Sequence, residues 1–193
     1  MADLEPLAGA LARAFEDDPV FDFCFPERNR DTSYRRFFEH DLRATHLGRD
    51  ETWTTVEGVR GAAVWAPPGQ WRQSIWALAR SFPSYARILG RKLPRSLRAL
   101  TAVESAHPPG EHYYLAVLGT DPSAQGTGVG SALLAPVLER CDREGIGAYL
   151  ESSKEENVAF YNRHHFEVTR ELPMPGHGPS VWLMWREPNP DRA

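Results

Sequence analysis

Apolar residues along the chain alternate between a helical and a strand-like spacing, and each change of spacing marks a boundary between elements. Spacings of three and four predict a first helix over residues 4–15 and a second over residues 31–48. A longer helical stretch covers residues 71–103. We expect it to break at Pro83 and Pro94, because proline lacks the backbone N–H that a helix needs. Three helical regions are therefore expected before the middle of the chain.

Runs of β-branched and aromatic residues predict the strands. Residues 52–56 and 61–66 are joined by a short link containing Gly58, which favours an antiparallel hairpin. Four further strands are expected, over residues 113–118, 146–151, 166–171 and 180–186, with a short helix over residues 157–164. The order of helices, hairpin, strand–helix–strand unit and final strand pair predicts a mixed α/β sheet.

Residues 112–135 join an apolar strand, a glycine-rich turn and the start of a helix, whose spacing begins between Gly128 and Ser131. The first four N–H groups of a helix have no partner within it, and the helix dipole is positive at that end. Such a turn can hold an anionic group through the backbone alone. Because Gly126, Gly128 and Gly130 have no Cβ atom, no side chain at these positions blocks the approach of a phosphate.

The known kinds of phosphate-binding loop differ in the spacing of their glycines, so the spacing in this turn indicates which kind it can be. A Walker loop ends in Gly-Lys-Ser/Thr, and no lysine lies near this turn. A dinucleotide fingerprint needs G-x-G-x-x-G, whose last spacing differs from that of residues 126–131. A third pattern, Q/R-x-x-G-x-G/A, matches residues 125–130. A turn that only links a strand to a helix remains the plain alternative.

The third pattern, placed after a strand that ends in Asp121-Pro122, resembles motif A of the GNAT superfamily of N-acetyltransferases. The resemblance implies the GNAT fold, a mostly antiparallel central sheet flanked by helices, and acetyl-CoA as co-substrate. It also implies that the loop holds the pyrophosphate and that the strand end pairs with the pantetheine amides. The implied acetyl-CoA-binding residues are Leu118, Gly119, Thr120, Gln125, Gly126, Thr127, Gly128, Val129, Gly130, Ser131, Asn157 and Phe160.

A second stretch, residues 157–166, resembles the superfamily pattern N-x-x-x-Y-x-x-x-G-F at Asn157, Tyr161 and Phe166. His165 stands where the pattern has glycine, and we expect it at a positive φ, which histidine adopts at some cost. In the superfamily the tyrosine often protonates the leaving thiolate. Tyr161 is therefore the candidate general acid, and a Phe-Tyr pair that only packs in the core is the alternative.

The attacking amine must lose a proton first, because an alkyl ammonium has a pKa of about 10 and no lone pair. Glu151, at the end of a strand expected beside the central one, is the candidate base. A solvated strand end, an arginine partner, or an ordered water acting as base are the alternatives. Neither Cys24 nor Cys141 lies in a nucleophile motif, so we expect direct attack within a ternary complex.

The acceptor is less well defined. The chain also resembles the GNAT branch that includes puromycin N-acetyltransferase, for example at residues 61–65 and 150–153. This implies a small-molecule amine, such as an aminonucleoside or another antibiotic. The acidic residues 16–18 and the tryptophans between residues 50 and 80 are candidates for its pocket. A solvated loop and core packing are the alternatives, and we expect Trp65 in the core.

The length, the net charge and the cysteines of the chain limit the number of domains, the kinds of partner and the kinds of site that it can have. The 193 residues fit a single domain, 1–193, in which residues 1–111 shape the acceptor site and residues 112–186 form the acetyl-CoA core. A net charge of −4, without a basic run, argues against nucleic acid as partner. No apolar run has the length of a membrane span. The two cysteines lack metal-ligand spacing and indicate buried thiols, with no metal, in a reducing compartment.

The sequence therefore favours a cytoplasmic acetyltransferase that acts on a small-molecule amine, as a monomer or a homodimer. Two other functions stay open at this point. One is a nucleotide- or dinucleotide-binding enzyme in which Glu151 binds ribose hydroxyls. The other is a non-catalytic module that binds acyl-CoA.

Overall fold

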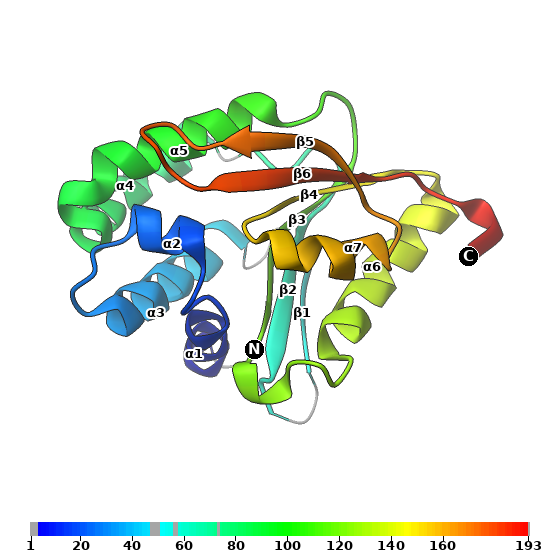
Figure 1. The fold of residues 1–193 in the computed structure, drawn as a ribbon, viewed down its shortest axis with the longest axis horizontal. Helices are drawn as coiled ribbons and strands as arrows, with labels where there is room; N and C mark the ends of the chain where they lie inside the picture. Colours follow the sequence, from blue (N-terminus) through cyan, green and yellow to red (C-terminus); the bar gives the residue numbers. More distant parts are fainter. Residues whose placement is uncertain (1–3, 47–50, 56–57, 73, 193) are drawn as a thin grey trace.

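The computed structural model describes residues 4–46, 51–55, 58–72 and 74–192. The strands of these residues form one sheet in the order β1-β2-β3-β4-β6-β5 (Figure 1). Within it β3 and β4 are parallel and all other neighbours are antiparallel, which confirms the predicted mixed, mostly antiparallel sheet. The strands are β1 (Glu51–Thr54), β2 (Gly61–Ala66), β3 (Tyr113–Thr120), β4 (Ala148–Ser152), β5 (Glu167–Pro173) and β6 (Ser180–Arg186).

The parallel pair β3–β4 separates along its length. The register joins Leu115 to Leu150 and extends no further, although β3 continues to Thr120. On its other edge β3 pairs with β2 and bulges at Ala116, which has no register partner there. A bulge bends its strand, so β3 diverges from β4 at this point. The divergence leaves room between the two strand ends.

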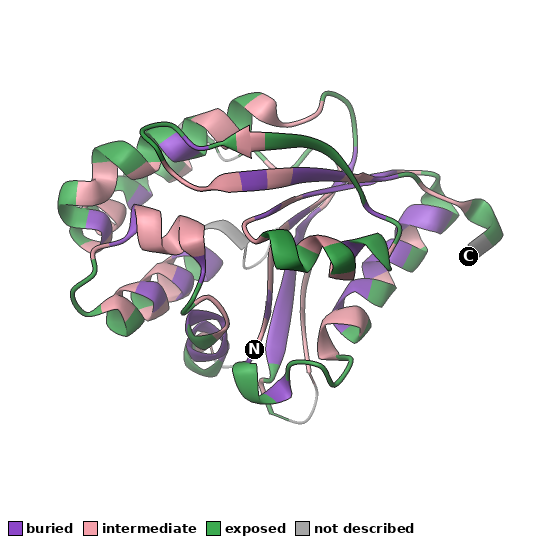
Figure 2. Cartoon of the chain, in the orientation of Figure 1, coloured by how far each residue is buried: buried purple, intermediate pink, exposed green. Residues whose placement is uncertain are grey.

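Helices cover both faces of the sheet, as Figure 1 shows. Val64 and Tyr149 belong to the apolar core beneath α1 to α5, whereas Trp65 and Leu150 belong to the core beneath α6 and α7. This alternation follows from the period of two along a strand, and the buried residues in Figure 2 run along the strands and the inner sides of the helices. The helices are α1 (Leu4–Ala14), α2 (Pro19–Cys24), α3 (Arg30–Asp41), α4 (Ile75–Leu89), α5 (Leu93–Ala106), α6 (Val129–Glu144) and α7 (Val158–Asn162).

Prolines account for most departures from the predicted helices. The break expected at Pro83 is wrong, because Pro83 lies inside α4 and the chain turns at Gly90 instead. Pro83 and Ala79 are both exposed, so water can bind the carbonyl that proline leaves without a partner. Pro94 and Pro19 stand in the first turns of α5 and α2, where a missing N–H costs nothing. Helix α2 was not predicted.

Several predicted boundaries differ by one to four residues or cannot be compared; for example, β4 begins at Ala148 and not at residue 146, and α4 begins at Ile75 and not at residue 71. Helix α3 ends at Asp41 and continues as a π-helical turn over Leu42–His46, while the predicted end at Gly48 lies outside the described residues. Strand β1 ends at Thr54, and Val56 also lies outside them. Among the helices that the structure describes, none combines the length and the apolar character that a membrane span requires.

Candidate active site

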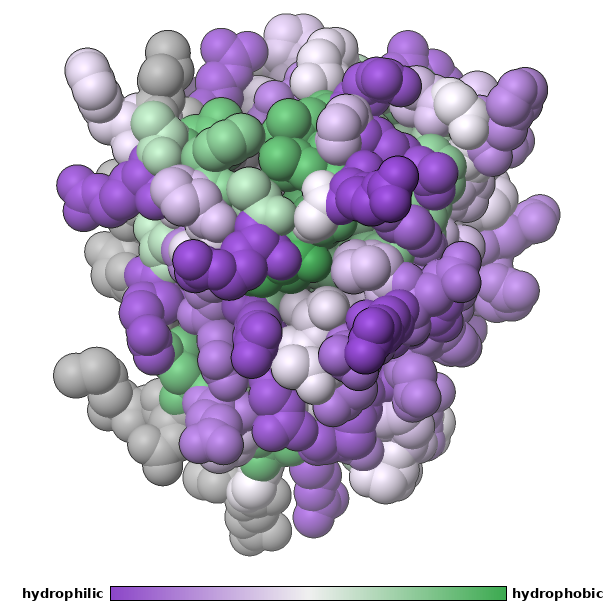
Figure 3. All heavy atoms as spheres, turned by 90° about the vertical axis from the view of Figure 1, so that its left-hand side faces the viewer, coloured by the Kyte–Doolittle hydropathy of each residue, from purple (hydrophilic) through white to green (hydrophobic). Residues whose placement is uncertain are grey.

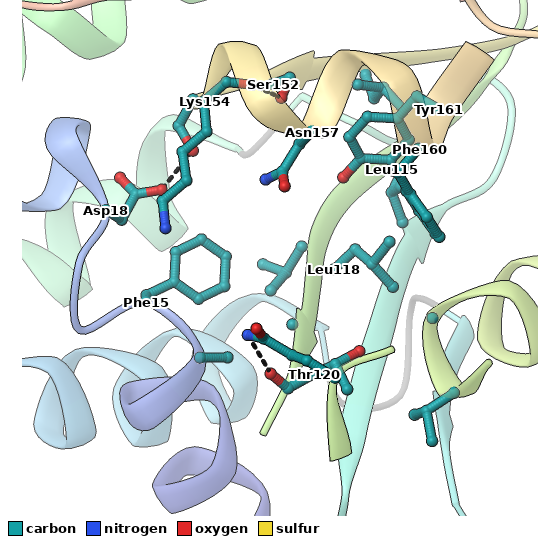
Figure 4. A pocket seen from close by; sticks show the side chains of 18 of the residues that line it. Phe15, Asp18, Leu115, Leu118, Thr120, Ser152, Lys154, Asn157, Phe160 and Tyr161 are labelled. Atoms are coloured by element: carbon teal, nitrogen blue, oxygen red, sulfur yellow. Dashed lines mark hydrogen bonds between the residues drawn. The ribbon is translucent and has the colours of Figure 1, made fainter. Parts of the chain in front are cut away.

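A cleft of about 520 Å³ opens where β3 and β4 diverge. Its walls are β3 with the glycine loop, the end of β4 with α7, and the turn after α1 (Figure 4). The structure brings together in it the candidate catalytic residues and all predicted acetyl-CoA-binding residues except Thr127. The Thr127 hydroxyl instead donates to the carbonyl of Ala124 at 2.7 Å, which shapes the loop. Sequence reasoning missed further lining residues, among them Phe15, Ser153 and Lys154.

The glycine loop has the backbone that an anion site requires. Gly126 and Gly128 have φ values of 74° and 88°, and Gly128 is the N-cap of the 16-residue helix α6. A Cβ added at either would meet no atom within 4 Å, so their side of the loop is open. At Gly130 an added Cβ would lie 3.2 Å from Cζ of Phe160. Gln125 Nε2 donates to the carbonyl of Thr120 at 3.3 Å and ties the loop to the strand.

The end of β3 offers one backbone edge to the cleft. Gly119 and Thr120 pair with β2 on the other edge, while no described strand pairs with β3 on the β4 side beyond Leu115. Gly119 is needed for packing, since an added Cβ would lie 2.7 Å from Cδ2 of Leu11. The free edge and the open loop fit a ligand with amides followed by a pyrophosphate. Acetyl-CoA is such a ligand.

Tyr161 is held at the cleft wall by α7. It is 8% exposed and contacts Phe160, with ring centroids 5.2 Å apart. Phe166 is fully buried behind it, and His165 adopts φ 66°, as expected. Burial raises the pKa of the Tyr161 phenol, and the charge of Asp18 raises it further. The hydroxyl therefore stays protonated at neutral pH, as a general acid must.

Glu151 is not a solvated strand end, because its side chain is 9% exposed. Its Oε2 accepts a hydrogen bond from the Tyr114 hydroxyl at 2.9 Å. Its Oε1 lies 3.6 Å from Nδ1 of His107 and has no hydrogen-bond partner among the described residues. The indole of Trp71 stacks on His107 at a centroid distance of 3.6 Å. Glu151 thus has a buried, oriented carboxylate with one oxygen available.

A second pocket, of about 240 Å³, lies against the other face of β3. It shares Phe15, Ala116 and Val117 with the cleft, so the two spaces meet at the bulge of β3. Its other lining residues are mainly aromatic side chains and a few polar groups, namely Phe21, Phe37, Phe38, Asp41, Ala66, Gln70, Trp71, Arg72, Leu100, Val103, Glu104, His107 and Tyr114.

The tryptophan candidates divide between core, pocket and surface. Trp65 is fully buried in the core, as expected, and Trp71 lines the second pocket. Trp53 packs beside the core beneath α6, and Trp76 is 83% exposed on α4. Figure 3 shows apolar side chains gathered on the face that is on the left of Figure 1, where α4 and α5 lie.

Two of the three acidic residues after α1, Asp17 and Asp18, line the cleft, whereas Glu16 is exposed and none of the three lines the second pocket. Asp18 is 3% exposed, and its Oδ1 caps α2 by accepting from the backbone N–H groups of Val20 and Phe21 at 2.9 Å. Its other oxygen accepts from the Ser153 hydroxyl. Burial raises the pKa of this carboxyl. The neighbouring Asp17 forms an ion pair with Lys154 on the same rim.

Both cysteines are buried free thiols, as predicted. Burial raises the pKa of each, for Cys141 to about 12. Neither residue lines the cleft or the second pocket. A thiolate nucleophile is thus not provided by either residue.

Comparison with known proteins identifies the family of the chain. Residues 19–166 match the model of the acetyltransferase (GNAT) family. The chain belongs to this family. It is therefore an acetyl-CoA-dependent acyltransferase of the GNAT class, acting on amines. The predicted dinucleotide-binding and non-catalytic alternatives are set aside.

Individual GNAT relatives agree over nearly the whole chain. An uncharacterised N-acetyltransferase of Schizosaccharomyces pombe is 27% identical over 202 residues, covering 96% of this chain and 80% of that protein. A crystal structure from Corynebacterium glutamicum, described as histone acetyltransferase HPA2 and related acetyltransferase, is 27% identical with a TM-score of 0.75, covering 97% and 92% of the two chains. A polyamine N-acetyltransferase of Drosophila melanogaster shares the fold at 17% identity, with a TM-score of 0.55 and coverage of 92% and 90%.

Proposed function

We propose that this GNAT enzyme transfers the acetyl group of acetyl-CoA to the primary amine of a compact small molecule within a ternary complex. Acetyl-CoA occupies the cleft, and the amine enters from the second pocket. The position of Glu151 carries the proposal. Its side chain lines the cleft, while its partners Tyr114 and His107 line the pocket. The carboxylate is therefore placed where the two substrates meet.

The chain's own residues supply the binding of the co-substrate. The N–H groups at the start of α6, with Gly126 and Gly128 in the loop before it, hold the pyrophosphate. The free edge of β3 at Leu118 to Thr120 pairs with the amides of the pantetheine arm. Bound acetyl-CoA supplies an activated acetyl thioester. Phe160 and Asn157 close the opposite wall of the cleft.

Two side chains move protons during the transfer. Oε1 of Glu151, which is buried and has no hydrogen-bond partner within the described part of the chain, accepts the proton of the incoming ammonium group. The amine lone pair is then free to attack. The Tyr161 hydroxyl, protonated because of its burial, donates its proton to the departing thiolate. Base and acid reside on neighbouring segments, β4 and α7.

The second pocket sets the acceptor class. Its volume of about 240 Å³ and its aromatic wall fit a compact apolar or aromatic body that carries the amine. The same wall carries the carboxylates of Asp41 and Glu104 and one guanidinium, that of Arg72, so carboxylates outnumber cations around the amine. An aminonucleoside has these properties, and the resemblance to the puromycin N-acetyltransferase branch supports puromycin as a test compound.

An amine screen that measures thiol release from acetyl-CoA tests the proposal. The panel contains puromycin, 2-phenylethylamine, agmatine and a lysine-containing peptide, and we expect an aromatic amine to give the highest kcat/KM. Release with the peptide alone, or with none of the amines, contradicts the proposed acceptor class.

Substitution of Tyr161 by phenylalanine tests the acid. We expect kcat to fall about 100-fold with an unchanged Kd for acetyl-CoA, because only proton donation is lost. Tyr113→Phe is the matched control, since Tyr113 is equally buried but donates to Glu144, outside both pockets. Wild-type turnover of Tyr161→Phe excludes the residue as the acid.

A further inference from the structure

A row of buried side chains continues from Glu151 away from the cleft. His107, which caps the end of α5, has Nδ1 3.6 Å from Oε1 of Glu151 and Nε2 2.8 Å from Nε2 of His112. The side chain of His107 is 2% exposed, and His112 is 1% exposed. Nδ1 of His112 lies 3.1 Å from the carbonyl oxygen of Gly110. Neither histidine belongs to a motif of the cleft.

The carbonyl group of Gly110, at the far end of this row, determines which ring nitrogens of the two histidines carry hydrogen. The Gly110 carbonyl can only accept, so Nδ1 of His112 carries a hydrogen. Burial and the nearby charge of His107 lower the pKa of His112 to about 4. Its ring is therefore neutral at neutral pH, and its Nε2 must accept the hydrogen bond. The hydrogen in the 2.8 Å contact consequently belongs to Nε2 of His107.

This assignment leaves Nδ1 of His107 facing the carboxylate of Glu151. A neutral His107 directs a lone pair at a negatively charged oxygen 3.6 Å away, which is repulsive. One proton placed on either atom replaces that repulsion by attraction. The separation is slightly longer than a hydrogen bond, so a proton also draws the two atoms together. The pair therefore binds a first proton more strongly than either group alone.

We propose that Glu151 and His107 act as one base, in which the proton taken from the substrate ammonium is held between Oε1 of Glu151 and Nδ1 of His107. This rests on the proposed function. The ammonium N–H bond breaks, its electron pair stays on the amine nitrogen, and a new O–H or N–H bond forms within the pair. His112 is a positioning residue, because it fixes the tautomer of His107 from the far side.

A second group beside Glu151 matters because a lone carboxylate is far more acidic than the substrate ammonium group. An isolated glutamate has a pKa of about 4.3 and an alkyl ammonium one of about 10, so a lone carboxylate is a weak base for this proton. A base is most effective when its pKa lies near the working pH. Two groups in close contact take up their first proton jointly, so that proton belongs to the pair and not to the carboxylate alone. Among the described residues, the other titratable or charged groups around the pair are Asp41, Arg72, Glu104, His112, Tyr114, Tyr149 and Arg170.

Nuclear magnetic resonance of the histidine rings tests the pair without any acceptor. Long-range ¹H–¹⁵N spectra of the full chain are recorded across a pH titration, for the wild type and for Glu151→Gln. We expect neutral His107 to carry its hydrogen on Nε2. We also expect Glu151→Gln to lower the pKa of His107 by about one unit or more, because the carboxylate that stabilises the imidazolium is gone. An unchanged His107 titration, or a hydrogen on Nδ1, overturns the proposal.

The pH dependence of kcat, measured with the amine that the screen identifies, tests the same pair during turnover. In His107→Gln we expect the acidic limb to move about one unit or more toward lower pH and the maximal kcat to fall about tenfold. His177→Asn, an exposed histidine with φ 58° outside both pockets, is the control and should leave the profile unchanged. An unmoved limb in His107→Gln overturns the joint base.

The carboxylate base and the Glu151–His107 pair are tested separately by these variants. A wild-type profile in Glu151→Gln removes Glu151 itself from the proposed mechanism. Loss of activity in Glu151→Gln together with a wild-type profile in His107→Gln retains the carboxylate base and removes only the pair. The Kd for acetyl-CoA, expected to be unchanged in every variant, verifies that each protein is folded.

Discussion

Replacing Gly128 by alanine separates the conformational role of the loop from its role in binding. Gly128 has φ 88°, where a residue with a Cβ is strained by about 1 kcal/mol. No atom lies within 4 Å of the added methyl group, so strain alone lowers the free energy of unfolding. The methyl group also enters the space through which a pyrophosphate approaches the N–H groups of α6. Loss of one charge-assisted hydrogen bond, about 1.5 kcal/mol or more, raises the Kd for acetyl-CoA roughly tenfold.

Gly176→Ala provides a matched control. Gly176 has φ 76° and equally open surroundings, but it lies in the β5–β6 connection, outside both pockets. We expect both variants to lose about 1 kcal/mol in urea unfolding and only Gly128→Ala to lose affinity in calorimetry with acetyl-CoA. Equal losses of affinity in the two variants, or none in Gly128→Ala, refute the loop as the pyrophosphate site.

Three further predictions concern stability. Asp142→Ala leaves the buried guanidinium of Arg186 without the carboxylate that binds it at 2.7 and 2.8 Å, and urea unfolding should show a loss of about 3–5 kcal/mol; less than about 1 kcal/mol contradicts this. The pKa of His112 falls from 6.5 to about 4 on folding, so the unfolded chain binds the proton first. Stability should therefore drop by about 3 kcal/mol as pH falls from 6.5 to 4, and the same slope in His112→Gln excludes this cause. Gly119→Ala forces a Cβ to within 2.7 Å of Leu11, and thermal unfolding should report a loss of about 1–3 kcal/mol rather than none.

Local signals were sufficient for most of the fold. The run of apolar and aromatic residues predicted β6 over residues 180–186, its observed bounds, and the range predicted for the start of α6, Gly128 to Ser131, contains the observed Val129. Helix α2 was missed because six residues are too short for a helical period to show. Asp18 followed by Pro19 did carry a signal, an N-cap followed by proline in the first turn. At Pro83 the solvent exposure of the helix decided the outcome, and exposure is not encoded in the local sequence.

The site could be predicted only where one motif contains its parts. Gln125 to Ser131 are contiguous, so the spacing alone indicated that they form one loop, and all of them except Thr127 line the cleft. Tyr114 and Glu151 are 37 residues apart, and they meet because the parallel register places Tyr114 opposite Tyr149, on the same face as Glu151. His107 reaches the same carboxylate from the end of α5. Periodicity gives no register between strands, so these neighbours required the structure.

Phe15 stands in the wall that the cleft and the second pocket share. Its ring packs on Phe21 and Phe38, with centroids 4.9 and 5.3 Å away, so a shift on one side moves a cluster of rings on the other. Cooperativity between two ligands is reciprocal. The factor by which acetyl-CoA changes the affinity for the amine must equal the factor by which the amine changes the affinity for acetyl-CoA. One phenyl ring is common to both spaces, so any coupling that passes through it acts with equal strength in both directions.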